Sequence, residues 1–133
     1  MLGPRPMHWL VDGYNVIRRN HELADVEARD GLAAGRQALC NRLANAARRS
    51  RDRFTVVFDG ARGGGQVHGG VGVSVVFSSA QKTADAVLIE RAGPEVTVVS
   101  DDRDVADGAR GAGARTLSVG SFSTRIRGEG RRR

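Results

Sequence analysis

The most strand-like run in this chain of 133 residues is Val96-Thr97-Val98-Val99, and it leads directly into Ser100-Asp101-Asp102-Arg103-Asp104. Four successive β-branched residues favour a strand that is buried on both faces. The acidic residues after it are good helix starters, so we expect a helix from Arg103 to Arg110 and then a short strand from Ala114 to Leu117. A buried strand followed by a helix and a second strand is typical of a parallel sheet.

The same alternation continues towards the N-terminus. Three further segments have the composition of strands, namely 8–11, 54–58 and 71–77. Residues 12–15 are rich in turn formers, so we expect an exit loop after the first of these strands. Two segments have apolar residues at helical spacing, namely 31–51 and 83–92, the second with Thr83 as its N-cap. We therefore predict one α/β domain over residues 1–124, with a mostly parallel central sheet and helices on both faces.

Two segments are biased in composition. Residues 60–72 are rich in glycine but lack the Gly-Lys-Ser/Thr ending of a phosphate-binding P-loop, so we expect a mobile connection there. Residues 125–133 are mostly arginine and glycine and form a predicted basic tail. This tail either contacts a nucleic-acid backbone or is a frayed terminus.

The composition limits the class of protein. With 40% hydrophobic and 27% charged residues, the chain is expected to fold in water. No apolar run approaches the roughly 20 residues needed to cross a bilayer, and residues 1–10 lack the apolar segment of a secretion signal. Cys40 is the only cysteine, which excludes an intramolecular disulfide and disfavours a zinc site. We expect a cytoplasmic protein with no membrane partner.

The charge balance points to a polyanionic partner. The chain has 21 basic and 15 acidic residues, a net charge of +6, and all but one of the basic residues are arginine. Because the flat guanidinium group suits phosphate, we expect nucleic acid rather than an acidic protein. A solvated arginine-rich surface without a partner is the plainer alternative.

Aspartates stand where the predicted strands end. Asp12 closes the first strand, Asp59 the second, and Asp101 and Asp102 follow the strand at 96–99, while Asp85 opens a helix. Because the carboxyl ends of parallel strands share one edge of a sheet, we expect these side chains to meet there. Such a cluster would repel itself unless a cation is bound, and oxygen ligands alone favour Mg²⁺ or Mn²⁺. Taken singly, each aspartate could instead form a turn or cap a helix.

The order of these motifs resembles a known family. Val11-Asp12-Gly13-Tyr14-Asn15, Val57-Phe58-Asp59-Gly60, Thr83-Ala84-Asp85 and Ser100 to Asp104 follow one another as in the NYN ribonucleases of the YacP type, a branch of the PIN-like nuclease superfamily. The resemblance runs from about Trp9 to Phe122. It implies a PIN-like three-layer fold and a divalent-metal-dependent endoribonuclease that cuts RNA, in some relatives on ribosome-associated mRNA.

The resemblance also implies roles for individual residues. It makes three aspartates the catalytic metal ligands or their water-mediated partners: Asp12, Asp85 and Asp102. The implied supporting residues are Asn15, Asp59, Ser100, Asp101 and Asp104. Relatives often have a small hydroxyl residue at the position of Asp101, so the division of labour between Asp101 and Asp102 is open. The chain is short after Phe122 for this family, and we expect a closing helix reduced to residues 121–126.

Basic residues outside the acidic motifs are candidates for holding RNA phosphates: Arg48, Arg49, Arg62, Lys82 and Arg103. Tyr14 is a possible stacking platform for a base, although packing in the interior is its more ordinary role. The sequence makes no prediction of the oligomeric state.

Two other functions compete with the nuclease. One is a non-catalytic RNA-binding protein of the same fold. The other is a phosphatase of the haloacid-dehalogenase type. The residues of this chain that resemble the ordered motifs of that family are Asp12, Ser78, Lys82 and Asp101-Asp102. That family needs a second aspartate two places after the first, and Tyr14 stands there.

Overall fold

The chain is built around one six-stranded sheet, seen in a computed structural model that describes residues 5–60 and 65–130. The strands are β1 (His8–Asp12), β2 (Arg53–Phe58), β3 (Gly65–Gly70), β4 (Val73–Phe77), β5 (Val96–Val99) and β6 (Arg115–Leu117). Their order across the sheet is β3-β4-β2-β1-β5-β6, and only the β3–β4 pair is antiparallel. The predicted α/β class with a mostly parallel sheet is confirmed.

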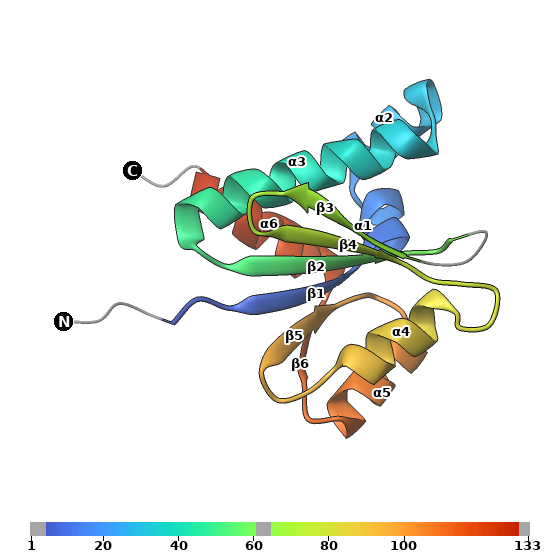
Figure 1. The fold of residues 1–133 in the computed structure, drawn as a ribbon. Helices are drawn as coiled ribbons and strands as arrows, with labels where there is room; N and C mark the ends of the chain where they lie inside the picture. Colours follow the sequence, from blue (N-terminus) through green and yellow to red (C-terminus); the bar gives the residue numbers. More distant parts are fainter. Residues whose placement is uncertain (1–4, 61–64, 131–133) are drawn as a thin grey trace.

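Helices cover both faces of the sheet (Figure 1). They are α1 (Gly13–Arg19), α2 (His21–Asp30), α3 (Leu32–Ser50), α4 (Ala84–Arg91), α5 (Arg103–Gly111) and α6 (Val119–Gly130). α1, α2, α3 and α6 lie on one side of the sheet, and α4 and α5 lie on the other. In the part of the chain that the structure describes, no helix combines the length and the apolar composition that crossing a membrane requires.

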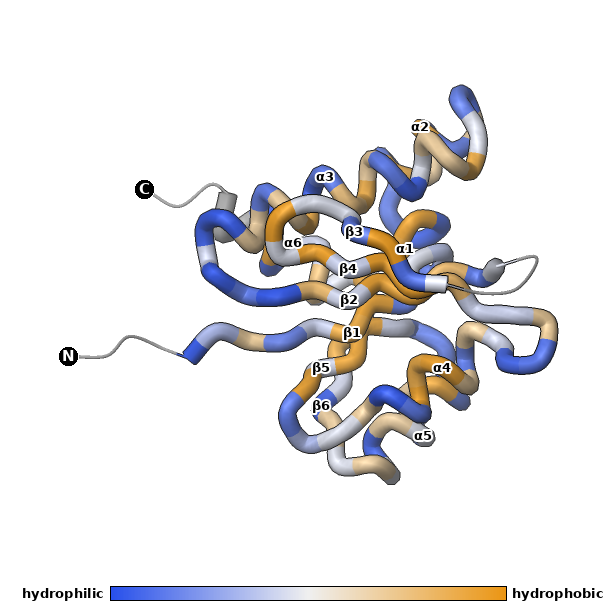
Figure 2. The backbone as a smooth tube through the Cα atoms, in the orientation of Figure 1, coloured by the Kyte–Doolittle hydropathy of each residue, from blue (hydrophilic) through white to orange (hydrophobic). Residues whose placement is uncertain are grey.

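Successive residues of the central strand supply two separate cores. On β1, Trp9 and Val11 pack with α3 and α6, whereas Leu10 packs with α4 and α5. Figure 2 shows the corresponding hydrophobic colouring along the middle of the sheet. The centre of the Trp9 indole ring lies 5.3 Å from the centre of the Phe122 ring. Nε1 of Trp9 donates a hydrogen bond of 2.9 Å to Asp52 Oδ2. Burial on both faces explains why the middle of β1 is a continuous apolar run, Trp9-Leu10-Val11.

The segment after β1 differs from the prediction. Residues 12–15 were expected to form an exit loop, but helix α1 begins at Gly13 and α2 follows it. A Cβ atom at Gly13 would lie only 2.4 Å from Cε1 of Phe58, so glycine lets the helix start close against β2. This contact joins residues far apart in the sequence, and local composition does not reveal it.

Two further segments are more ordered than expected. Residues 65–70, predicted as part of a mobile connection, form edge strand β3, with a register shift between His68 and Gly70. The closing helix α6 is longer than residues 121–126, and it continues into the predicted basic tail as far as Gly130. Phe122 is fully buried and Ile126 packs against the same core, which explains why the helix is retained.

The sheet order reverses at β1. The connection from β1 to β2 runs over one face through α3, and the connection from β4 to β5 runs over the other face through α4. Such a switch point opens a crevice at the carboxyl ends of the strands, where ligands of open α/β sheets bind. Asp12 lies at this point, at the end of β1.

Candidate active site

A cavity of about 380 Å³ lies at the carboxyl ends of the central strands. Four of its lining residues are the aspartates Asp12, Asp59, Asp85 and Asp102, and we call it the acidic cavity. The other lining residues are Tyr14, Asn15, Arg18, Arg19, Val57 and Ala84. The structure thus brings together four of the aspartates that the sequence singled out, from the end of β1, the residue after β2, the first turn of α4 and the N-cap of α5.

Asp12 is held by a buried serine. Ser100 Oγ donates a hydrogen bond of 2.7 Å to Asp12 Oδ2 and accepts one of 3.0 Å from the backbone nitrogen of Asp102. Ser100 follows β5, the neighbour of β1, so its position is fixed by the pairing of these two strands. The hydrogen bonds fix the orientation of the Asp12 carboxylate and tie it to the start of α5.

The pKa of Asp12 is raised to about 6. Burial is the main cause, since it disfavours the charged carboxylate, and the hydrogen bond from Ser100 acts in the opposite direction. The charges of Asp85, Asp102 and Asp59 raise the pKa further. Among residues 5–60 and 65–130, no lysine or arginine forms an ion pair within 4.0 Å of these four carboxylates. None of the four carboxylates is therefore paired directly with a basic side chain of the described residues.

Asp85 and Asp102 come from the helices on the second face. Asp85 is exposed in the first turn of α4, which Thr83 caps as predicted. Its pKa is raised, first by partial burial and then by the charges of Asp102, Asp104 and Asp59. Asp102 is the N-cap of α5 and accepts a hydrogen bond of 3.1 Å from the backbone nitrogen of Val105 on Oδ1. One carboxylate therefore both starts a helix and lines the cavity.

Asp59 is positioned from the neighbouring strand. Ser78, at the end of β4, donates a hydrogen bond of 2.9 Å to Asp59 Oδ1 and accepts one of 3.0 Å from the backbone nitrogen of Gly60. The serine that the phosphatase comparison singled out thus orients an aspartate of the acidic cavity.

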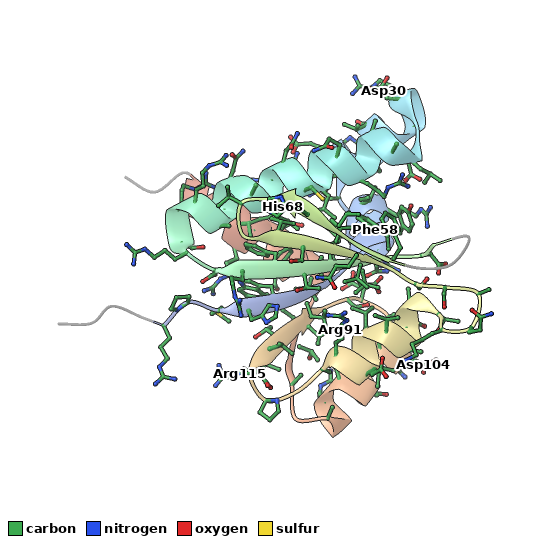
Figure 3. All side chains as sticks on the ribbon, in the orientation of Figure 1. Asp30, Phe58, His68, Arg91, Asp104 and Arg115 are labelled. Atoms are coloured by element: carbon green, nitrogen blue, oxygen red, sulfur yellow. The ribbon has the colours of Figure 1, made fainter. Side chains whose placement is uncertain are left out.

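Asp101 does not line the acidic cavity. Its Oδ1 accepts a hydrogen bond of 2.9 Å from the backbone nitrogen of Val119, and its Oδ2 lies 3.6 Å from Nη1 of Arg19. The backbone nitrogen of Asp101 donates a hydrogen bond of 2.8 Å to Oδ1 of Asn15. Asp101 and Asn15 therefore connect α1, α5 and α6, and of the two adjacent aspartates it is Asp102 that lines the cavity. Asp104 is exposed on α5, labelled in Figure 3, and lies outside the cavity lining.

The connection through Asp101 makes a prediction about stability. Replacing Asp101 by alanine is expected to lower the free energy of unfolding by about 2 kcal/mol, because the first turn of α6 loses a charged hydrogen-bond acceptor. Asp101→Asn, which keeps an oxygen acceptor, should lose less. Urea denaturation measures both, with Asp107→Ala on the exposed face of α5 as the control. An Asp101→Ala variant as stable as the wild type would contradict this role.

The basic residues proposed for RNA lie elsewhere on the surface. Arg48 and Arg49 are in the last turn of α3, Arg103 begins α5, and Lys82 lies 2.8 Å from both carboxylate oxygens of Glu90. None of these four residues lines the acidic cavity, and Arg62 falls outside the residues that the structure describes.

Two cations at the acidic cavity were missed from the sequence. Arg18 and Arg19 occupy the last turn of α1 and line the cavity. A helix predicted to start at Gly13 would have placed these two arginines near Asp12, because they lie in its last turn. Because the segment was interpreted as a loop, these arginines had no predicted location.

The donor set of the acidic cavity suits a hard divalent cation. All four aspartates offer oxygen, which Mg²⁺ and Mn²⁺ prefer. The pKa of Asp12 is raised first by burial and then by the charges of its neighbours, and a bound cation would offset those charges. In the described residues, however, no three Asp, Glu, His or Cys side chains are grouped closely enough to hold one ion by themselves. The residues therefore fit a cation in charge and donor type, with water as part of its coordination shell.

The chain is similar to known proteins in sequence and in fold. The family model of the YacP-like NYN domain matches residues 9–132. Two solved structures of Rae1 (YacP) from Bacillus subtilis are similar in fold. A single-residue mutant gives a TM-score of 0.76 at 24% identity, covering 94% of this chain and 77% of that one. The other structure gives 0.71 at 25% identity, covering 92% and 75%. Comparison with curated proteins gave no match.

Proposed function

Because the chain belongs to the family of YacP-like NYN domains, which have a nuclease-like fold, we propose that it is an endoribonuclease that uses Mg²⁺ or Mn²⁺ at the acidic cavity. The observation that carries the proposal is the convergence of four carboxylates on the switch point of the sheet, none of them in an ion pair with a basic side chain of the described residues. The net charge of +6 supports a polyanionic substrate, since the rest of the surface must be strongly basic.

Several residues in and beside the acidic cavity have a proposed part in phosphodiester hydrolysis. Asp12, Asp85 and Asp102 would hold the cation, directly or through water. When bound, the cation supplies hydroxide near neutral pH and stabilises negative charge on the phosphoryl group. Ser100 keeps Asp12 in its orientation, and Ser78 does the same for Asp59. Asn15 acts indirectly, because it fixes the backbone at Asp101.

The phosphatase alternative receives little support. Tyr14 occupies the position of the second aspartate that this chemistry needs, and its ring packs 5.0 Å from that of Phe58. Lys82 is paired with Glu90 and does not line the acidic cavity. The non-catalytic RNA-binding alternative is consistent with the charge, and it differs from our proposal only in activity.

A circular RNA tests the proposal, since it has no ends and only an endonuclease can open it. We expect the purified chain to linearise this RNA with Mg²⁺ or Mn²⁺ and not with excess EDTA. The same reaction with mRNA bound to ribosomes tests whether that form is preferred. Tight RNA binding without cleavage under every metal condition would favour the non-catalytic protein. Turnover of a small phosphomonoester with intact RNA would favour the phosphatase.

A further inference from the structure

A stacked pair of side chains lies at the edge of the acidic cavity. The guanidinium carbon of Arg18 is 4.9 Å from the centre of the Tyr14 ring, and both residues line the cavity. They come from the first and last turns of α1, directly after Asp12. We call this pair the Tyr14–Arg18 stack. It places a flat, positively charged group beside the carboxylates.

The Tyr14 side chain is fixed from behind. Its hydroxyl oxygen accepts a hydrogen bond of 2.8 Å from Nη1 of Arg36, and its ring packs against Phe58 at a tilt of 52°. Arg36 in turn lies 5.7 Å from the centre of the Phe77 ring. Contacts from α3, β2 and β4 thus hold the ring in one position, which makes it a stable base for the arginine above it.

Arg18 is held but remains open to solvent. Its Nη2 lies 3.3 Å from Oε2 of Glu27, and 59% of its side chain is exposed. An exposed ion pair of this kind contributes at most about 1 kcal/mol to stability. Arg18 also makes no ion pair with an aspartate of the acidic cavity. Neither folding nor charge neutralisation therefore accounts for a planar cation placed here.

The chemistry of a stacked guanidinium identifies what it binds. Its plane matches a nucleobase, and RNA-binding proteins stack unpaired bases on arginine and aromatic side chains. A base inside a duplex already has neighbours on both faces, so it is not available for such a contact. We propose that the Tyr14–Arg18 stack binds the base of a nucleotide whose phosphate enters the acidic cavity, and thereby selects unpaired RNA. The inference rests on the proposed function for the role of the cavity.

Binding of short RNAs tests this inference separately from catalysis. The Asp85→Asn chain serves as the background, so that substrate stays intact, and affinity is measured by fluorescence anisotropy in EDTA. The probes are a single-stranded 12-mer, the same 12-mer in a duplex, and a series in which one abasic nucleotide is moved along the strand. Arg18→Ala and Arg18→Lys are compared with Arg29→Ala, an exposed arginine of α2 that does not line the cavity.

We expect both Arg18 variants to bind the single strand about tenfold more weakly, which is the size of one base-stacking contact of about 1.4 kcal/mol. Lysine keeps the charge but not the plane, so Arg18→Lys should not restore binding. At one position of the series, the abasic nucleotide should weaken RNA binding by the protein that retains Arg18 by the same factor. It should not change RNA binding by the Arg18→Ala protein. Arg29→Ala should lower the affinity for the single strand by less than about twofold.

Two outcomes would overturn the inference. One is an equal loss for single-stranded, duplex and all abasic RNAs, which would make Arg18 a simple phosphate contact. The other is wild-type affinity in Arg18→Lys. Neither outcome bears on whether the chain cuts RNA, whereas full cleavage by Asp85→Asn would contradict the proposed function and leave the binding result standing.

Discussion

Substitution of Asp85 by asparagine is expected to reduce RNA cleavage about a thousandfold, equivalent to about 4 kcal/mol of transition-state stabilisation. Asparagine has nearly the same shape but removes one negative charge from the acidic cavity, where Asp85 lies beside Asp12 and Asp102. Because Asp85 is exposed at the start of α4, the fold should tolerate the change. Single-turnover cleavage of a labelled RNA at saturating Mn²⁺ measures the effect.

The matched control is Asp107→Asn. Asp107 is an exposed aspartate of α5 that pairs with Arg110 and does not line the acidic cavity, so its variant should cut at the wild-type rate. RNA affinity should be unchanged or slightly higher in both variants, since each loses a negative charge. Unchanged cleavage by Asp85→Asn would show that the carboxylate from α4 has no part in catalysis. Equal losses in both variants would show that charge in general, and not this carboxylate, matters.

The stability of the metal-free protein is expected to depend on pH through Asp12. Its pKa in the folded protein, about 6, lies above the ordinary value of an aspartate. The neutral form is thus favoured by folding, so this contribution is complete below about pH 4 and is lost as pH rises through 6. The loss amounts to about 2 to 3 kcal/mol in the free energy of unfolding by pH 7.

Asp12→Asn isolates this effect, because its amide oxygen can still accept the hydrogen bond from Ser100 but has no charge to lose. Denaturation from pH 4 to 8 in EDTA should show that the free energy of unfolding of the variant increases relative to that of the wild type as pH rises. Added Mg²⁺ or Mn²⁺ at pH 7 should then stabilise the wild type and not the variant, since a cation bound only by the folded state shifts the equilibrium. A stability difference that does not change with pH would contradict a buried, repelled carboxylate at this position.

The parts of the fold that were predictable depend on local pattern. The strands at 54–58 and 96–99 and the helix after Thr83 follow from composition and capping residues, which act over a few positions. Strand β3 was missed because half of its residues are glycine and most are exposed, and it is a strand only because β4 pairs with it. Helix α1 was missed because its start depends on the distant contact of Gly13 with Phe58.

In the candidate site, too, some residues could be placed from the sequence and others depend on contacts between distant segments. Strand ends meet at one edge of a parallel sheet, so Asp12, Asp59 and Asp102 could be placed together from the sequence. The direction of Asp101 could not, because it depends on where α5 begins and on the position of α6. Arg18 was invisible for a related reason, since its place at the cavity follows from the course of α1.

The pairing of β1 with β5 has a consequence for synthesis of the chain. Residues 8–11 leave the ribosome first among the strands, yet their partner on one side is residues 96–99. Until that partner emerges, one edge of β1 has no neighbour, and Ser100 is not present to hold Asp12. A nascent chain that stops before residue 96 already contains Asp12, Asp59 and Asp85. It lacks β5 and Asp102, which the acidic cavity needs. The carboxylates of the acidic cavity are therefore brought together only after residues 96–102 have been synthesised.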